Sequence, residues 1–178
     1  MKKFLYLGIT TLFLSATVKA DFYAGAGLGM GVNGGKSRLN NLVSSYKDSG
    51  VLSLNGGYEL PLPLFDIRGE VEVLRTRPET KDGRTKQLDG LFLNAYADIP
   101  LIPIVDPYVG LGLGRVRYDH SNSYAFQGML GGEYELPFAP VSIAGEYRYL
   151  KINERSGKSN ATSKFYSNIL MFKARYSF

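Results

Sequence analysis

The sequence predicts an all-β fold, an eight-stranded antiparallel up-and-down β-barrel that spans a membrane. Three observations support this fold class. Apolar and polar residues alternate with a period of two, a strand–turn–strand unit recurs along the chain, and short proline-rich turns alternate with mostly longer polar connections. An even number of strands of about ten residues, with short turns at one end and long loops at the other, is typical of outer-membrane barrels.

The alternation is clear in individual segments of the chain. Between residues 141 and 150 the two faces read Val141, Ile143, Gly145, Tyr147 and Tyr149 against Ser142, Ala144, Glu146 and Arg148. A soluble lipocalin-like barrel has the same period but keeps its apolar face inside. Here the polar face mixes charges with glycines, at positions 25, 27 and 29 and again at 110, 112 and 114. Glycines leave room in a narrow lumen for long side chains from the opposite wall, so we favour the membrane barrel.

An internal repeat gives the strand count. The segment YELPLPLFDIRGEVEVL from Tyr58 aligns without a gap to YELPFAPVSIAGEYRYL from Tyr134, and a looser copy starts at Tyr96. Each copy is a strand, a short turn and a return strand, because proline cannot donate to a strand ladder. Three copies supply six strands, and the segments 21–30 and 165–178 bring the total to eight.

In chain order, we expect strands at residues 22–30, 51–60, 65–75, 88–99, 107–118, 123–136, 141–153 and 165–178. The proline-rich turns lie near residues 61–64, 100–106 and 137–140, and the polar connections span residues 31–50, 76–87, 119–122 and 154–164. Both ends of the barrel domain then lie on the short-turn side, which faces the periplasm.

The first twenty residues are typical of a signal peptide. Met1, Lys2 and Lys3 precede an apolar stretch, and small residues, Val18 and Ala20, flank Lys19 before a cleavage site at Asp21. We therefore expect a signal peptide at residues 1–20 and a single barrel domain at residues 21–178. Its removal lowers the formal net charge from +5 to +2, so the composition gives little support to nucleic-acid binding.

Eight charged residues lie three to seven positions from the proline-rich turns, on the polar face of four strands. They are Arg68, Glu70, Glu72, Glu133, Glu146, Arg148, Lys173 and Arg175. At ~3.3 Å per residue they share one layer of the lumen. Buried charges are costly unless paired, and an eight-stranded barrel is only wide enough to be filled by side chains. We expect a salt-bridged plug that holds the barrel together, in preference to an ion-conducting or gating role.

Together, the signal peptide, the eight amphipathic strands, the proline-rich turns and the C-terminal Tyr176-Ser177-Phe178 resemble the small outer-membrane β-barrel superfamily. This superfamily includes the OmpA membrane domain, OmpX, the Opa adhesins and related surface antigens. The resemblance covers the whole mature chain and rests on pattern, with no motif of one subfamily. It implies a bacterial outer-membrane location, a filled charged lumen and insertion by the barrel-assembly machinery, which reads an aromatic terminus such as Phe178 with Tyr176 before it. The chain ends at the barrel, so we expect no peptidoglycan-binding domain.

The sequence offers little chemistry for catalysis. It has no cysteine and one histidine, His120, so we expect no metal site and no cofactor. Some small outer-membrane barrels are lipid A deacylases with a His-x-Ser pair on one strand. Here Asn122 takes the place of that serine, and the adjacent Ser121 would point to the opposite face. We therefore expect no enzyme and assign no catalytic residue.

The connections on the long-loop side are basic. Residues 75–87 hold five cations against two acids. Cations at the outer-leaflet level can pair with lipopolysaccharide phosphates, and we expect a rim that includes Arg75, Arg77, Arg115, Arg117 and Lys151. An ordinary solvated loop surface is the alternative reading.

The expected function is that of a monomeric structural or surface-interaction barrel, adhesin-like, in contact with outer-membrane lipids and with a host or surface ligand at its loops. A narrow porin for ions or small solutes is the alternative, and a lipid A-modifying enzyme comes third. We expect no nucleic-acid partner.

Overall fold

The computed structural model describes residues 21–39, 42–45, 50–62, 64–76, 88–99, 104–118, 121–155 and 162–178. The predicted signal peptide lies outside these residues. The strands are β1 (Asp21–Leu39), β2 (Leu42–Ser45), β3 (Gly50–Pro61), β4 (Asp66–Thr76), β5 (Leu88–Asp98), β6 (Asp106–Tyr118), β7 (Ser121–Glu135), β8 (Val141–Arg155) and β9 (Thr162–Ser177). In this described part, no helix has the length and apolar character needed to cross a membrane.

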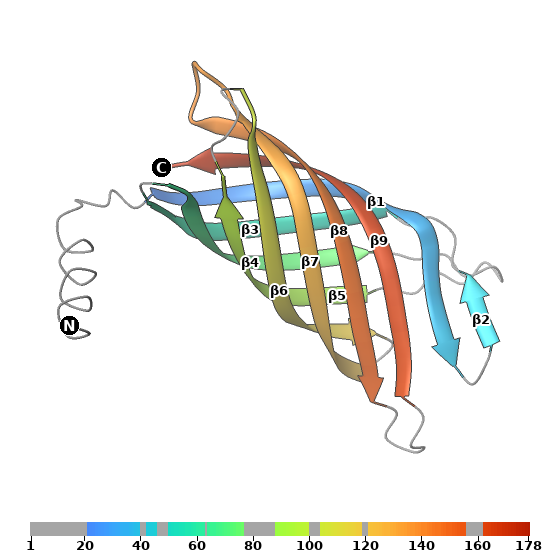
Figure 1. Ribbon diagram of the computed structural model, residues 1–178. Coiled ribbons are helices and arrows are strands. Elements are labelled where there is room, and N and C mark those ends of the chain that lie inside the picture. The colour runs from blue at the N-terminus through green and yellow to red at the C-terminus, as the bar shows by residue number, and fades with distance from the viewer. Residues whose placement is uncertain are drawn as a thin grey trace, which may run out of the picture.

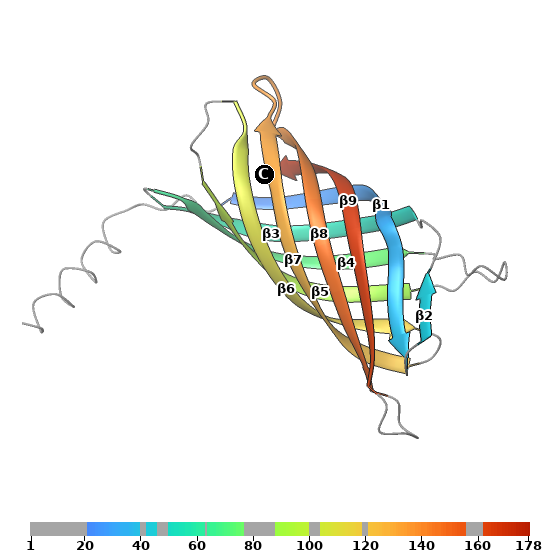
Figure 2. The ribbon, with the colours of Figure 1, turned by 45° about the vertical axis from the view of Figure 1, so that its right-hand side comes forward.

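Eight of these strands form a closed antiparallel barrel, which confirms the predicted fold class. Each strand from β3 to β9 pairs with its sequence neighbour, and β1 pairs with both β3 and β9. A lateral row of paired residues that starts at Phe22 returns to β1 at Val32, so the stagger around the barrel is ten residues. This stagger tilts the strands strongly against the barrel axis, as Figure 2 shows.

The segment 31–50, expected as a loop, is partly strand. β1 continues past the end of β3 to Leu39, and β2 pairs with this extension outside the barrel wall (Figure 1). The polar, glycine-rich sequence after Met30 lacks the alternation that marks a strand. The extension nevertheless finds partners on the long β9, where Lys36 lies opposite Tyr166 after an irregularity beyond Val32. β7 likewise begins at Ser121, inside the connection expected at residues 119–122.

The short turns gather at one end of the barrel. The end of β5, the start of β6, the β7–β8 turn, the start of β1 and the C-terminus all lie on this side (Figure 1). The amide of Leu136 donates to the carbonyl of Val141 across the β7–β8 turn, at 2.9 Å. The amide of Phe178 donates to the carbonyl of Phe22, also at 2.9 Å, which fixes the terminus against β1.

The two faces of the wall differ as the alternation predicts. Large apolar side chains such as Leu28, Leu93 and Phe172 are exposed on the outer face, where a membrane barrel meets lipid. The lumen has two layers. The half next to the short turns holds charged residues, and the other half holds a buried apolar cluster that includes Leu74 and Leu150.

Candidate functional site

The most elaborate side-chain arrangement lies in the lumen, near the short-turn end. All eight predicted lumen residues point inward and are buried or half-buried. The structure brings them together and adds two acids, Glu59 and Asp98, that the sequence analysis did not place there. The ten residues form two clusters, each with two cations and three carboxylates.

The lower cluster lies nearest the short turns and consists of Glu59, Arg68, Asp98, Glu133 and Arg175. The guanidinium of Arg68 makes a bidentate contact with the carboxylate of Asp98, at 2.6 and 2.7 Å. Its remaining nitrogen lies 2.9 Å from Glu133. Arg175 lies 2.6 Å from both Glu133 and Glu59. Glu133 therefore joins two arginines, which ties β4, β7 and β9 together through one carboxylate.

The upper cluster lies directly above and consists of Glu70, Glu72, Glu146, Arg148 and Lys173. Arg148 contacts Glu72 at 2.8 Å and Glu146 at 2.6 Å, and the side chains of Arg148 and Glu72 are 0% exposed. Lys173 lies 3.5 Å from Glu70 and 3.6 Å from Glu146. The cluster spans the lumen, since its members come from β4, β8 and β9.

Neutral polar residues complete the contacts of the carboxylates. Glu70 accepts hydrogen bonds from Tyr23, Asn55, Asn94 and Tyr96. Such donors stabilise a buried carboxylate, because charge-assisted hydrogen bonds are stronger than neutral ones. Sequence reasoning missed these donors because tyrosine and asparagine on an inward row look like ordinary filling, and only the register shows that they converge on Glu70.

Tyrosine rings contact cations of both clusters. Arg68 lies 5.0 Å from the ring centre of Tyr96 and 4.9 Å from that of Tyr108. Lys173 of the upper cluster lies 5.3 Å from the centre of the same Tyr96 ring. Cation–π contacts contribute about 0.5–2 kcal/mol, most when desolvated. The rings therefore stabilise these largely buried cations.

The lumen around these charges is nearly solid. Two cavities beside the clusters measure about 10 and 50 Å³. A cavity needs about 10–15 Å³ of space accessible to water to hold one water molecule, so these two spaces are large enough for isolated waters at most. Above the upper cluster, Leu74, Phe92 and Val116 belong to the apolar layer that continues toward the long-loop end. The sequence predicted the charged layer but not the apolar layer that fills the other half of the lumen.

Inward glycines make the tight filling geometrically feasible. A Cβ on Gly112 would overlap the side chains of Asn94 and Gln127, and a Cβ on Gly110 would overlap the ring of Tyr96. These glycines lie on β6, where the sequence analysis expected space for side chains from other strands. A larger residue at either position would force the neighbouring side chains to shift.

The predicted basic rim lies on the outer face, at the end of the barrel opposite the short turns. Arg75 is 53% exposed and lies 2.7 Å from Asp89. Asp89 is in turn paired in register with Arg117 on β6. Arg115 donates a 3.3 Å hydrogen bond to the hydroxyl of Tyr124 and lies 5.4 Å from its ring centre.

Lys151 lies on the same outer face, opposite Phe126 in the ladder. Four of the five rim residues thus share one face and one end of the barrel, among aromatic residues. The fifth, Arg77, lies outside the described residues.

The two predicted assembly residues lie on the outer face at the end of β9. The rings of Tyr176 and Phe178 pack edge to face, with centres 5.2 Å apart. Both are exposed on the side that faces lipid. His120 lies outside the described residues. Among the residues that the structure describes, no group of three His, Cys, Asp or Glu side chains is arranged to hold a metal ion.

Comparisons with known proteins agree with this architecture. The family model of the outer membrane protein β-barrel domain matches residues 4–178. No curated protein sequence matches the chain.

Among solved structures, Neisserial surface protein A is 21% identical, with 89% of this chain and 99% of that chain covered and a TM-score of 0.64. The outer membrane enzyme PagL is 13% identical, with coverages of 84% and 97% and a TM-score of 0.58. OprG from Pseudomonas aeruginosa is 14% identical, with coverages of 90% and 97% and a TM-score of 0.52. At these identities the likeness shows the fold alone.

Proposed function

Because the chain belongs to the outer membrane protein β-barrel family, we propose that it serves as a structural and surface-interaction barrel, adhesin-like, in the bacterial outer membrane. The observation that carries this proposal is the filled lumen. The paired charges around Arg148 and the apolar layer above them fill the described part of the lumen, which supports a plugged barrel over a porin. The lumen charges then stabilise the barrel, and function resides on the outer face and at the long-loop end.

The outer rim supports contact with lipopolysaccharide. Arg75, Arg115, Arg117 and Lys151 lie on the lipid-facing side, at the strand ends far from the periplasmic turns. Arginine makes charge-assisted, often bidentate bonds to phosphate, and the neighbouring Tyr124 suits the membrane interface. We propose that this rim binds the phosphates of the outer leaflet and so fixes the height at which the loops are presented.

The rim is tested by the lipopolysaccharide that co-purifies with the barrel. The variant Arg115→Gln/Arg117→Gln should retain less of it during washes of rising ionic strength. The matched control, Arg115→Lys/Arg117→Lys, keeps the positive charge but loses the bidentate fork, so it should retain more lipopolysaccharide than the glutamine variant and less than the wild type. Equal retention in the wild type and the glutamine variant would remove the rim from the proposal.

The surface-interaction role is tested with whole bacteria. Cells that display the barrel should adhere to host cells or matrix, and deletions within the long-loop connections, at residues 78–86 and 156–160, should lower adhesion while the barrel remains folded. If the proposal is wrong, bacteria with the wild-type barrel should adhere no more strongly than bacteria with the loop-deleted barrels.

The proposal also excludes an enzyme. Masses of lipid A should be the same with and without expression of the barrel. A mass shift that disappears in His120→Ala would show instead that the barrel modifies lipid.

A further inference from the structure

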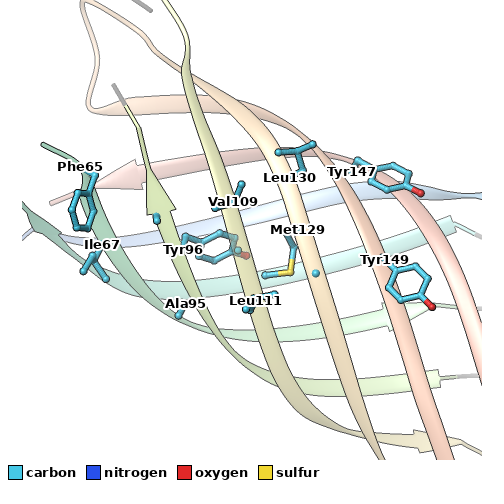
Figure 3. Close-up of a pocket in the computed structure, with 13 residues that line it drawn as sticks. Phe65, Ile67, Ala95, Tyr96, Val109, Leu111, Met129, Leu130, Tyr147 and Tyr149 are labelled. Carbon is cyan, nitrogen blue, oxygen red and sulfur yellow. The ribbon is translucent and has the colours of Figure 1, made fainter. Parts of the chain in front are cut away.

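The outer wall of the barrel carries a groove of about 730 Å³ over strands β4 to β8. Its lining is almost entirely apolar. The small residues Ala95, Ala97 and Gly128 lie in it, with Phe65 and Ile67 at the β4 side and Tyr147 and Tyr149 at the β8 side (Figure 3). A depression of this size is unexpected on a wall whose other outward residues are mostly leucine, valine and aromatics.

The small residues create the depression. A Cβ on Gly128 would meet no atom within 4 Å, so the space outside its backbone is open. Ala95 lies two strands away in the same lateral row, with Leu111 between them. On the inner side of the wall, the ring of Tyr96 packs against Gly110. Most of the lining residues point outward, and the buried Tyr96 and Met129 form part of the floor of the groove.

The groove begins at the periplasmic edge and climbs the wall. Phe65 directly precedes β4 at the short-turn end, and Ile67 is the second residue of that strand. Tyr149 lies halfway along β8, and its ring is held in a stack with Tyr166, with centres 6.1 Å apart. The groove thus runs from the periplasmic edge of the wall toward the middle of the membrane.

We infer that this groove binds one acyl chain of a phospholipid from the periplasmic leaflet. The lipid-facing wall is already in contact with hydrocarbon, and the groove is continuous with that surface. Its end at Phe65 and Ile67 lies at the periplasmic edge of the wall, the level at which an inner-leaflet chain starts. An acyl chain packed against Ala95 and Gly128 gives these residues dispersion contacts that an unfilled groove would not provide.

A second copy of the barrel fits the groove poorly. A two-fold contact brings the same surface of both partners together, so it would set one concave surface against another. The void between them would lack the close packing of stable protein contacts. A thin, flexible chain has no such restriction, because it bends to follow the groove between Ile67 and Tyr147. This inference concerns the periplasmic half of the outer wall and does not depend on the proposed surface role.

Native mass spectrometry of the barrel, released from membranes in a mild detergent, tests the inference. The wild type should carry one phospholipid per barrel. Ala95→Leu/Gly128→Leu fills the groove and should lose it. Gly145→Leu is the matched control, because a Cβ on Gly145 would also point outward and meet no atom within 4 Å, and Gly145 does not line the groove. This control should keep the lipid.

The inference is overturned if the filled variant keeps the lipid, if the control loses it equally, or if filling the groove abolishes a dimer. The folded state of each variant is checked by its heat-dependent shift on electrophoresis.

A second measurement uses the absence of tryptophan from the sequence. Leu111→Trp places a fluorophore in the groove, and Leu54→Trp places one on the outer face of β3, at similar exposure. A phosphatidylethanolamine with a dibrominated acyl chain is titrated into detergent-solubilised protein. The indole of the Leu111→Trp variant should be quenched in a saturable manner at one lipid per barrel. The indole of the Leu54→Trp variant should be quenched only in proportion to bulk lipid, and parallel quenching of both would contradict a bound chain.

Discussion

The substitution Arg148→Met tests the stabilising role of the lumen charges. Methionine keeps much of the volume of the arginine stem but removes the guanidinium. Glu72 and Glu146 then lose their ion-pair contacts at 2.8 and 2.6 Å. Loss of one partner of a buried ion pair costs about 3–5 kcal/mol, because the remaining charge stays buried without compensation.

The structure places the expected cost at the lower end of that range. Glu72 keeps hydrogen bonds from Asn94 and Gln127, at 3.0 and 3.1 Å. Glu146 keeps Lys173 at 3.6 Å. We therefore expect Arg148→Met to lower the free energy of unfolding by about 3 kcal/mol. Urea unfolding in lipid vesicles, followed by circular dichroism and by the electrophoretic shift, measures this change.

Two controls separate the lumen pair from general effects of charge removal. Arg75→Met removes the same group from the exposed pair with Asp89 and should cost about 0–1 kcal/mol. The double variant Arg148→Met/Glu72→Gln removes one uncompensated charge and should recover part of the loss. The reasoning is refuted if Arg148→Met lowers the free energy of unfolding by less than Arg75→Met does. It is also refuted if adding Glu72→Gln to Arg148→Met lowers the free energy of unfolding further instead of raising it.

Two further predictions concern packing and assembly. Gly112→Ala should cost ~1–3 kcal/mol because its Cβ overlaps Asn94 and Gln127, whereas Gly128→Ala, with open space, should change stability by less than about 1 kcal/mol; equal unfolding midpoints for the two would contradict the filled lumen. Deletion of Phe178 should reduce outer-membrane levels more than it reduces the stability of refolded protein, since it removes the Phe22 contact and the terminal aromatic. Phe138→Ala, at a 99% exposed turn position, should leave levels normal; fractionation and immunoblotting report both, and a Phe178 deletion with wild-type levels would count against an assembly role.

Much of the barrel could be predicted from local pattern. The period-two alternation assigns each residue of β4 and β8 to a face, and the repeat supplies the strand count. The extension of β1 beyond Val32 could not be predicted in this way. Its residues are polar and glycine-rich, and its strand character comes from pairing with β9, a partner more than a hundred residues away in sequence.

The candidate site shows the same division between local and long-range information. Distance from the proline-rich turns placed Arg68 and Glu133 at one level, where the structure joins them at 2.9 Å. The sequence pattern does not assign Asp98 to the lumen, because at the very end of β5 a strand residue cannot be distinguished from a turn residue. Its contact with Arg68 follows from lateral neighbours that only the register defines.

The central claim is that the lumen is closed and that the barrel acts through its surface, and single-channel recording in planar bilayers tests it most directly. Purified wild-type protein, inserted and shown to be folded, should produce no reproducible conductance steps at moderate voltage in concentrated salt. Stable, ohmic steps whose size or ion selectivity changes in Arg148→Met would contradict the claim and establish the narrow porin instead.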